Sequence, residues 1–414
     1  MPEVKPSEVE STASIKVIGV GGAGGSAVNR MREAGLAGVE FIAMNTDAQA
    51  LHSSKADVKV HLGHETTNGL GAGADPTVGE RAAEESREEI RNALEGADMA
   101  FITFGAGGGT GSGASYIVAE EARKQDILTV GVVTKPFSFE GVKRKANADW
   151  AIEHFSRNVD ALITIPNDRL LQTIDSRTPL NETFRIADDV LRQGVQGISE
   201  LITDESALIN LDFADVKTIM KDAGSALMGI GSASGENRAT IAAQQAIESP
   251  LIEVSIDGAR GVLISVVGGY DVTMAEIQEA ADLITASVDP SANIIWGASI
   301  RPELEDEIII TVVATGFDSQ YYDADNSLSS GDTFASDLSS SQAAPAPTQA
   351  AADPVRSMPA EEPATAEPIQ PETQASAVFT NNENVNMWDQ IRNDSDDDDS
   401  DIPAILRRRK KNKD

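Results

Sequence analysis

Cysteine is absent from this chain of 414 residues, and its absence removes several kinds of chemistry. Disulfide bonds, thiolate zinc sites and cysteine nucleophiles are excluded, and a cytosolic location is plausible. The four histidines form no HExxH pattern. His61 and His64 lie three residues apart, and we interpret them as solvated loop imidazoles rather than as metal ligands. We therefore assign no protein residue as a metal ligand.

The chain also lacks long apolar runs and an excess of positive charge. No stretch approaches the ~18 apolar residues of a membrane span, and residues 1–14 are polar, unlike a signal peptide. The formal net charge is −33 and the pI is about 4.4. Because non-specific nucleic-acid binding needs a basic surface, we expect no nucleic-acid partner.

Glycine, by contrast, is concentrated in two loops. Residues 19–25 follow the apolar run 15–18, and residues 105–113 follow the apolar run 99–104. Each segment has the pattern of a strand, a glycine turn and a helix. Backbone N–H groups can approach a phosphate closely where no Cβ intrudes, and the N-terminus of the following helix adds partial positive charge. Two such loops on parallel strands of one sheet predict a pocket for a polyphosphate.

The first half of the chain alternates apolar strands with helical stretches. The expected strands are residues 15–20, 39–45, 58–62, 99–104, 128–134 and 161–166. The expected helices are residues 25–34, 78–94, 113–124 and 143–156. Apolar strands separated by helices predict an α/β fold with a doubly wound, mostly parallel sheet. Ligands of such sheets bind at the carboxyl ends of the strands, where both glycine loops lie.

The later part of the chain has a different pattern of expected helices and strands. An amphipathic helix is expected over residues 181–201, followed by a second, smaller α/β unit. Its expected helices are residues 215–220, 236–248 and 274–287, and its expected strands are residues 261–267, 292–299 and 308–315. The predicted organisation is a disordered segment at 1–13, a nucleotide-binding domain at 14–180, a linking helix at 181–203, a second domain at 204–317, a linker at 318–400 and a tail at 401–414.

The linker and the tail have opposite character. Residues 318–400 are rich in Ser, Ala, Pro, Asp and Glu, so they cannot bury enough apolar area to order themselves. An apolar cluster at 387–391 within them is either a chance cluster or a weak docking site. The tail combines an apolar group with a basic run that ends at Lys413. It predicts a recognition peptide on a tether, with a solvated terminus as the alternative. The expected partner-binding residues are Asp401, Ile402, Pro403, Ile405, Leu406 and Arg407.

The first glycine loop alone permits another function. Its Gly19-x-Gly21-x-x-Gly24 spacing matches the dinucleotide fingerprint, and Asp47 is placed for a ribose contact. A nicotinamide or flavin oxidoreductase is therefore an alternative, although the second loop and the lack of a nearby His or Cys count against it. No Gly-Lys-Ser/Thr sequence is present. Backbone N–H groups, helix ends and Mg²⁺ would then have to balance the phosphate charge.

Several motifs in one order resemble the tubulin/FtsZ family of GTPases. The run Gly-Gly-Gly-Thr-Gly-Ser-Gly at residues 107–113 resembles the tubulin signature loop. The other motifs of the resemblance are residues 45–51, 71–74, 134–141, 165–168, 210–216 and 260–263. Together they cover about residues 14–317, with a further likeness at 401–407.

The resemblance implies a Mg²⁺-dependent GTPase that binds GTP and GDP and polymerises head-to-tail into filaments. It also implies assembly of the division ring at midcell, beneath the cytoplasmic face of the membrane. The tail would bind membrane-tethering and regulatory division proteins. Its basic run could also contact anionic lipid, at about 1 kcal/mol per charge near the surface.

The family pattern also assigns residues to GTP. Those that would line the nucleotide are Gly21, Gly22, Ala23, Gly24, Gly25, Ser26, Asn45, Gly107, Gly108, Gly109, Thr110, Gly111 and Ser112. Ala72, Gly73 and Ala74 would lie near the γ-phosphate, and Glu140 and Arg144 would hold the ribose region. Two positions depart from the pattern, because Ala23 and Ser26 stand where the family usually has Gly and Asn.

The guanine base would be recognised by a ring and polar groups. Phe184 would stack on the base, and Asn167 and Asp188 would read its edge. A carboxylate suits guanine because it accepts from N1–H and N2–H together. From the residues alone, Asp188 can equally be a solvated helix position, and either Asp188 or Asp189 could face the base.

Hydrolysis would need residues from the loop that contains Asn210, Asp212 and Asp215. Their simpler interpretation is helix capping, with Asp212 as N-cap and Asp215 as a first-turn acid. The resemblance instead implies that this loop completes the active site of the next subunit, so that assembly switches on hydrolysis. A tubulin-like scaffold that binds GTP without turnover is the third alternative.

Overall fold

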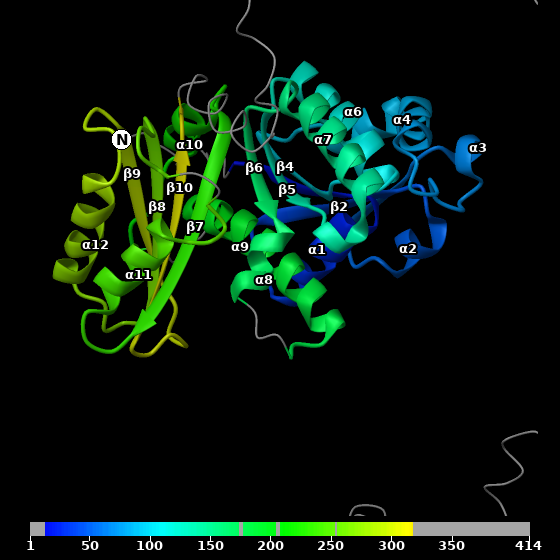
Figure 1. Cartoon of the computed structure of the whole chain (residues 1–414). Helices are drawn as coiled ribbons and strands as arrows, with labels where there is room; N and C mark the ends of the chain where they lie inside the picture. The colour runs from blue at the N-terminus through cyan, green and yellow to red at the C-terminus, as the bar shows by residue number, and fades with distance from the viewer. Residues whose placement is uncertain (1–12, 174–176, 204–207, 253–254, 318–414) are drawn as a thin grey trace, which may run out of the picture. The chain divides into compact units, whose positions relative to one another are not determined.

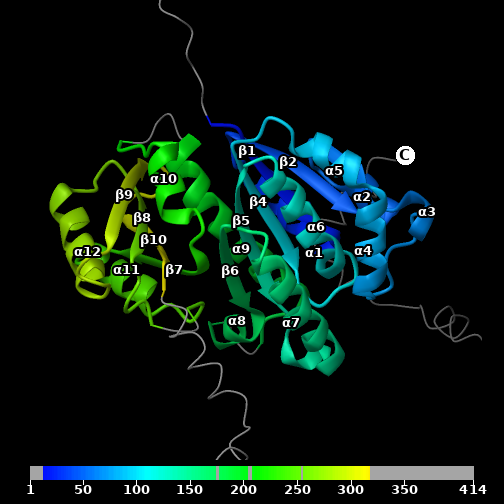
Figure 2. The same cartoon turned by 90° about the horizontal axis from the view of Figure 1, so that it is seen from above.

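The computed structural model describes residues 13–173, 177–203, 208–252 and 255–317 (Figures 1 and 2). The linker predicted at 318–400, the apolar cluster at 387–391 and the tail at 401–414 lie outside the described residues, as does nearly all of the predicted N-terminal segment. None of the described helices is long and apolar enough to cross a membrane.

Within this described part, one sheet of ten strands has the order β3-β2-β1-β4-β5-β6-β7-β10-β8-β9. The first six strands pair in parallel, and all of them except the edge strand β3 are mostly buried, as expected for the predicted doubly wound sheet. They are β1 (Ile15–Val20), β2 (Val39–Asn45), β3 (Val58–His61), β4 (Met99–Gly105), β5 (Leu128–Lys135) and β6 (Ala161–Pro166).

The remaining strands form the second half of the sheet. They are β7 (Gly224–Ser234), β8 (Gly261–Gly268), β9 (Asn293–Ile300) and β10 (Glu307–Thr315). β10 runs antiparallel to both β7 and β8, and β9 runs parallel to β8. One face of this half packs against α11 (Arg238–Ile247) and α12 (Met274–Ala286), which contribute Ala242, Ala246 and Ile284 to its core.

Helices cover both faces of the parallel half (Figure 2). One face packs against α1 (Gly21–Glu33), α9 (Leu180–Thr203) and α10 (Phe213–Met220). The other face packs against α4 (Pro76–Glu85), α5 (Arg87–Leu94), α6 (Thr110–Lys124) and α7 (Val142–Ser156). Shorter elements at the carboxyl ends of the strands are α2 (Ala48–Ser53), α3 (His64–Thr67), η1 (Ser138–Glu140) and α8 (Asn167–Thr173).

The long helix α9 reaches the far edge of the parallel strands. Its 24 residues span about 36 Å at 1.5 Å per residue. Its last residue, Thr203, packs against Gly38 just before β2, where an added Cβ would lie 2.5 Å from the Thr203 side chain. The end of α9 therefore lies at the amino ends of the strands, opposite the edge that carries the glycine loops.

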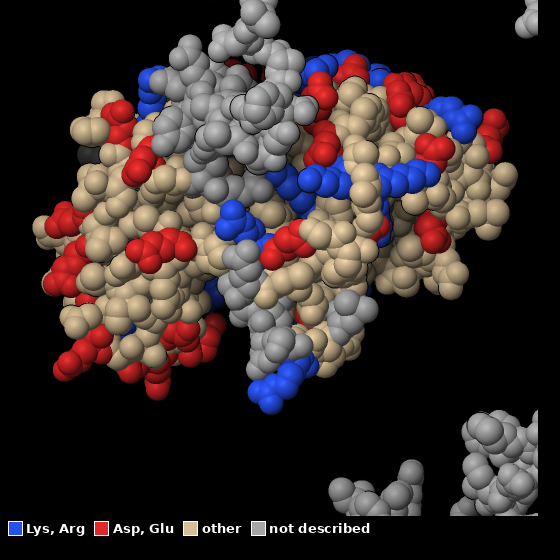
Figure 3. Space-filling model, in the orientation of Figure 1, with Lys and Arg blue, Asp and Glu red and all other residues tan. Residues whose placement is uncertain are grey.

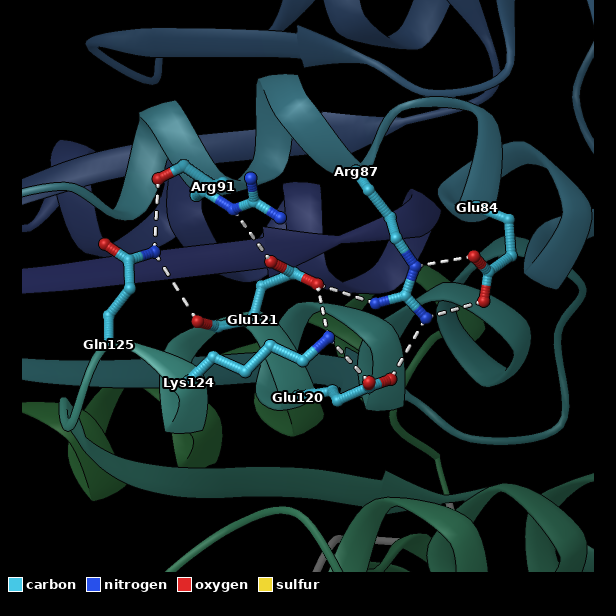
Figure 4. A network of polar contacts seen from close by, with 7 residues as sticks. All are labelled: Glu84, Arg87, Arg91, Glu120, Glu121, Lys124 and Gln125. Carbon is cyan, nitrogen blue, oxygen red and sulfur yellow. Dashed lines mark hydrogen bonds and ion pairs between the residues drawn. The ribbon is translucent and has the colours of Figure 1, made fainter.

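The helix predicted over residues 78–94 is two helices, because the chain bends at Ser86. The Ser86 hydroxyl accepts a hydrogen bond from the Gly63 N–H at 3.0 Å. The next residue, Arg87, forms ion pairs with Glu84 at 2.5 Å and Glu121 at 2.6 Å (Figure 4). The Glu121 side chain is fully buried and also pairs with Lys124. Tertiary contacts therefore fix this bend, and no Gly or Pro marks its position in the sequence.

The strand β7 was not among the predicted elements, and its glycines explain why. A Cβ at Gly229 would lie 1.9 Å from the Ala246 carbonyl oxygen, and one at Gly231 would lie 2.0 Å from that of Ala242. Helix α11 thus packs directly on the strand backbone.

The short helices α2, α3 and α8 were also not predicted, and α1 begins at Gly21, four residues earlier than expected.

Candidate nucleotide site

The two glycine loops meet backbone to backbone at the carboxyl ends of β1 and β4, which are neighbouring strands. Gly21 has a φ of +73°, and a Cβ there would lie 2.8 Å from the Gly111 nitrogen. Gly24 is equally close to β4, because its Cβ would lie 2.4 Å from the Thr103 carbonyl oxygen. Both α1 and α6 begin here, so the unpaired first-turn N–H groups of two helices converge on one place.

The outer side of the first loop is open. An added Cβ at Gly22 or Gly25 would meet nothing within 4 Å. Both residues line a small polar pocket with Ser26 and Asn45. Ala23 lies within the first turn of α1 without a positive φ, and its Cβ is accommodated because residue 105 is glycine. The departure at position 23 therefore introduces no backbone strain.

The second loop is held by its own hydrogen bonds. The Gly107 N–H donates to Ser112 Oγ at 2.9 Å, and the Ala106 N–H donates to the Thr134 carbonyl at 2.9 Å. Gly107 has a φ of +97°. These contacts leave Gly108, whose Cβ position is almost unobstructed, on the free side of the loop.

The segment at residues 71–75 lies against the second glycine loop. A Cβ at Gly109 would lie 2.8 Å from the Ala72 Cβ and 2.9 Å from the Asp75 nitrogen. Asp75 caps α4 by accepting a hydrogen bond from the Thr77 N–H at 2.9 Å. The two glycine loops, residues 19–25 and 105–113, are called the cradle below. The structure thus brings Ala72, with its neighbours Gly73 and Ala74, to this cradle, where they were predicted to lie.

Glu140 and Arg144 lie on the other flank of the cradle. Their side chains form an ion pair, and Glu140 also accepts a hydrogen bond from the Phe137 N–H at 2.9 Å. A Cβ at Gly107 would lie 2.7 Å from the Arg144 carbonyl oxygen, so the start of α7 is packed on the second loop. These predicted ribose residues therefore border the predicted phosphate residues.

A ring and a buried amide lie near the start of α9 and the end of β6. Phe184 is 43% exposed, and its ring packs edge-on against the buried Phe137 at a centroid distance of 5.6 Å. Asn167, the residue after β6, is buried, and its Oδ1 finds no hydrogen-bond partner in the described structure. A buried acceptor without a partner is costly, so a bound group is expected to satisfy it.

The two adjacent acids of α9 are in different electrostatic states. Asp189 is partly buried, yet its pKa is held below the usual range by Arg192 at 2.7 Å and Gln193 at 2.8 Å. Burial raises the pKa of Asp188 to about 6, and the charge of Arg30 offsets only part of this effect. The Asp189 carboxylate is thus hydrogen-bonded to residues of its own helix, whereas the Asp188 carboxyl is a desolvated acceptor.

The predicted catalytic residues do not join this cradle within one chain. Asn210, Asp212 and Asp215 are exposed at the start of α10. Leu211, the residue before Asp212, donates its N–H to the Leu201 carbonyl at 3.0 Å, near the end of α9 and therefore at the amino ends of the strands. Strands of six to eight residues at about 3.3 Å each place this edge roughly 20–26 Å from the glycine loops.

Asp212 occupies the N-cap position of α10 but does not cap it. Its side chain accepts no hydrogen bond from the first turn of the helix. Asp47, Asp75 and Thr273 do cap their helices through their side chains. The helix-capping interpretation of Asp212 therefore explains its position but not its free carboxylate.

Two residues that border the site were not singled out from the sequence. Thr46 contacts Thr110 through its hydroxyl, and Phe137 supports Phe184. Both lie inside motifs of the family resemblance, at residues 45–51 and 134–141, so the motifs marked the segments but not these side chains. Among the described residues, no group of three or more His, Asp or Glu side chains could hold a metal ion.

Comparison with known proteins gives a consistent result. The sequence model described as Tubulin/FtsZ family, GTPase domain, matches residues 14–175, and that of the FtsZ family, C-terminal domain, matches residues 224–318. An empty FtsZ dimer of M. jannaschii is 45% identical, with a TM-score of 0.72 over 74% of this chain and 89% of that one. The GDP-bound CetZ1 monomer of Haloferax volcanii is 22% identical, with a TM-score of 0.64 over 74% and 95% of the chains, and shares the fold. The chain therefore belongs to the FtsZ family, and it is a GTPase of this filament-forming group of cytoskeletal proteins.

Proposed function

We propose that the chain binds GTP in the cradle of the two glycine loops and polymerises head-to-tail, with hydrolysis completed by the neighbouring subunit. The filaments form the cytokinetic ring in the cytoplasm, at the division site beneath the cell membrane. The observation that carries the proposal is the placement of Asp212 and Asp215 on the edge of the sheet opposite the cradle. One subunit therefore holds both halves of an active site at ends that cannot meet.

The phosphates would be held by the backbone of the converging helix starts. The N–H groups of Gly21 and Gly22 belong to the unpaired first turn of α1, and Gly22 and Gly25 leave open space there. In the second loop, Gly108 is almost unobstructed and Thr110 begins α6. Such groups bind anions through N–H dipoles and helix-end charge. The segment that contains Ala72 would close on the γ-phosphate.

The base would lie between Phe184 and the polar pair of Asn167 and Asp188. The Asn167 amide has a buried acceptor to satisfy, and the Asp188 carboxylate lacks the ion pair that engages Asp189. Guanine offers two adjacent N–H donors, and adenine does not. This difference supports guanine as the base and Asp188 as its reader.

Mg²⁺ would be bound mainly by the nucleotide. The described residues offer no carboxylate cage, and Mg²⁺ commonly keeps several waters and binds phosphate oxygens. The neutral side-chain oxygens at the cradle include the Thr110 hydroxyl and the Asn45 amide. When bound, the ion would neutralise phosphate charge during transfer to water.

Hydrolysis would be completed across the contact between subunits. Asn210 and the two carboxylates of Asp212 and Asp215 are solvent-facing and available to orient water on the γ-phosphate of a neighbour. A head-to-tail contact of this kind does not close, so it generates a filament. Loss of the γ-phosphate would then weaken the contact and turn the filament over.

The tail would connect filaments to the membrane through tethering and regulatory division proteins. On the face seen in Figure 3, Asp and Glu gather over the region of α11 and α12. An acidic surface does not attract anionic lipid, so any weak lipid contact would come from the basic run after Arg407.

The test is phosphate release from GTP and Mg²⁺ measured against protein concentration, with light scattering recorded in parallel. A shared site predicts a rate per subunit that rises above a threshold concentration, together with scattering. A rate per subunit that is independent of concentration would show a self-contained site and refute the roles of Asp212 and Asp215. Scattering without phosphate release would favour a scaffold that binds GTP without turnover.

A further inference from the structure

Thr46 and Thr110 form a buried pair of hydroxyl groups, and the roles above include no use of the Thr46 hydroxyl. Their Oγ1 atoms are 2.6 Å apart, and the residues are 0% and 8% exposed. This separation is that of a full O–H···O hydrogen bond, so one hydroxyl donates to the other. Thr110 is the first residue of α6 in the second glycine loop, and Thr46 follows β2. The pair therefore joins the phosphate cradle to the loop after β2.

The backbone of Thr46 holds a second segment of the site. Its carbonyl oxygen accepts a hydrogen bond from the Gly71 N–H at 3.3 Å, and it shares the single proton of the Thr67 hydroxyl, at 3.2 Å, with the Gly63 carbonyl at 3.0 Å. Asp47, the next residue, forms an isolated bridge with Leu70. Thr46 thus contacts the cradle through its side chain and the segment at residues 71–75 through its main chain.

The backbone at residues 71–74 depends on such anchors. Gly71 and Gly73 have φ values of +85° and +60°, and Ala74, which is not glycine, has a φ of +60°. An alanine in the left-handed region persists only where surrounding contacts hold it. The anchors of this segment include the Thr46 carbonyl, the packing of Ala72 on Gly109, and a hydrogen bond that Asn147 Nδ2 donates to the Ala74 carbonyl at 3.4 Å.

We propose that Thr46 is a positioning residue for GTP hydrolysis, because it couples the Thr110 hydroxyl to the segment at residues 71–74. When the Thr110 hydroxyl donates to a phosphate oxygen, the single proton of the Thr46 hydroxyl must be the one donated to Thr110. Nucleotide binding therefore fixes the direction of the pair and, with it, the Thr46 side chain. The carbonyl of the same residue holds the segment that faces the γ-phosphate. The coupling rests on the proposed placement of residues 72–74 beside that phosphate.

The test compares three variants of the full chain. Thr46→Val keeps the shape of the side chain and removes the hydroxyl, whereas Thr46→Ser keeps the hydroxyl. Thr103→Val is the matched control, because Thr103 is also fully buried but its hydroxyl has no partner in the described structure. For each protein we would measure GDP affinity, kcat and KM per subunit above the assembly threshold, and amide exchange at residues 69–75.

The Thr46→Val variant is expected to lose about 3- to 10-fold in kcat, the worth of one buried hydrogen bond. Its GDP affinity should stay within about twofold, because Thr110 can still donate to a phosphate. Exchange at residues 69–75 should no longer differ between GDP and a non-hydrolysable GTP analogue. Thr46→Ser should keep the kcat and the nucleotide-dependent exchange of the wild type. The control Thr103→Val should keep both as well.

Several results would overturn the coupling. They are an unchanged kcat in Thr46→Val, a failure of Thr46→Ser to restore it, or equal losses of GDP and GTP affinity with the nucleotide-dependent exchange intact. A measurement on the wild-type protein distinguishes failure of the coupling from failure of the proposed function. If residues 69–75 of the wild type show no protection by the GTP analogue over GDP, then the proposed γ-phosphate contact is wrong, and the coupling falls with it.

Discussion

The base-reading role of Asp188 makes a quantitative prediction. A carboxylate that accepts from N1–H and N2–H of guanine forms two charge-assisted hydrogen bonds, each worth about 1.5–3 kcal/mol. Part of this gain offsets the burial that raises the Asp188 pKa to about 6. A net loss of about 3 kcal/mol is expected for Asp188→Asn, which is roughly 150-fold in GTP affinity. The neighbouring Asp189→Asn, whose carboxylate is engaged by Arg192, should bind GTP normally.

The Asp188→Asn variant should also change base preference. An amide presents one acceptor and one donor, which suit the N1–H and the O2 carbonyl of xanthine. Xanthosine triphosphate should therefore bind this variant more tightly than GTP, and the wild type should show the reverse order. The assay is nucleotide titration below the assembly threshold, so that binding is measured apart from polymerisation. GTP affinity of Asp188→Asn within twofold of the wild type would refute the assignment.

The raised pKa of Asp188 predicts opposite pH trends for GTP affinity and for the stability of the folded protein. Guanine binding needs the ionised carboxylate, so GTP affinity should fall about tenfold between pH 7 and pH 5 and level off above pH 7. The empty protein should behave in the other direction. A carboxyl whose folded pKa of about 6 exceeds its ordinary value of 3.8 favours the folded state as pH falls through that window, by up to about 3 kcal/mol. Neither trend should survive in Asp188→Asn.

Four further outcomes are expected. Asp212→Ala should bind GTP and assemble but release almost no phosphate, and full turnover in the phosphate assay would sink its catalytic role. Gly21→Ala should lower thermal stability without nucleotide by about 2 kcal/mol, because it combines a positive φ with a close approach to Gly111. Gly22→Ala should leave the melting temperature unchanged and weaken GDP binding, because its Cβ enters the open pocket. Deletion of residues 401–414 should preserve GTPase and assembly but abolish membrane recruitment in cells, and recruitment that survives the deletion would contradict the tether.

The parallel half of the fold was predictable from the sequence because its signals are local. Buried strands such as residues 15–20 are mostly apolar, and each is followed by a turn and a helix. The two glycine loops were correctly placed at the strand ends, although the first is the opening turn of α1 rather than a loop before it. The nicotinamide alternative rested on that loop alone, and the match to a GTPase domain over residues 14–175 replaces it.

What could not be predicted depends on contacts between distant segments. The bend at Ser86 is set by Gly63 and by the buried charges around Arg87, and neither leaves a local signal. The glycines of β7 weaken its strand pattern because they serve helix packing. The choice between Asp188 and Asp189 depends on the burial of Asp188, which only the folded chain shows, and on the ion pair of Asp189 with Arg192 within the same helix. The roles of both remain predictions.

The sheet has one narrow seam. β6 and β7 share only three register pairs, from Ala161 with Gly224 to Ile163 with Ala226, whereas β10 shares eight with each of its neighbours. In a filament that carries load, rotation about this seam would break fewer backbone hydrogen bonds than rotation at either β10 ladder. The seam would then be the compliant joint of each subunit, and the stiffness of a polymer would be set within its subunits as well as by the contacts between them.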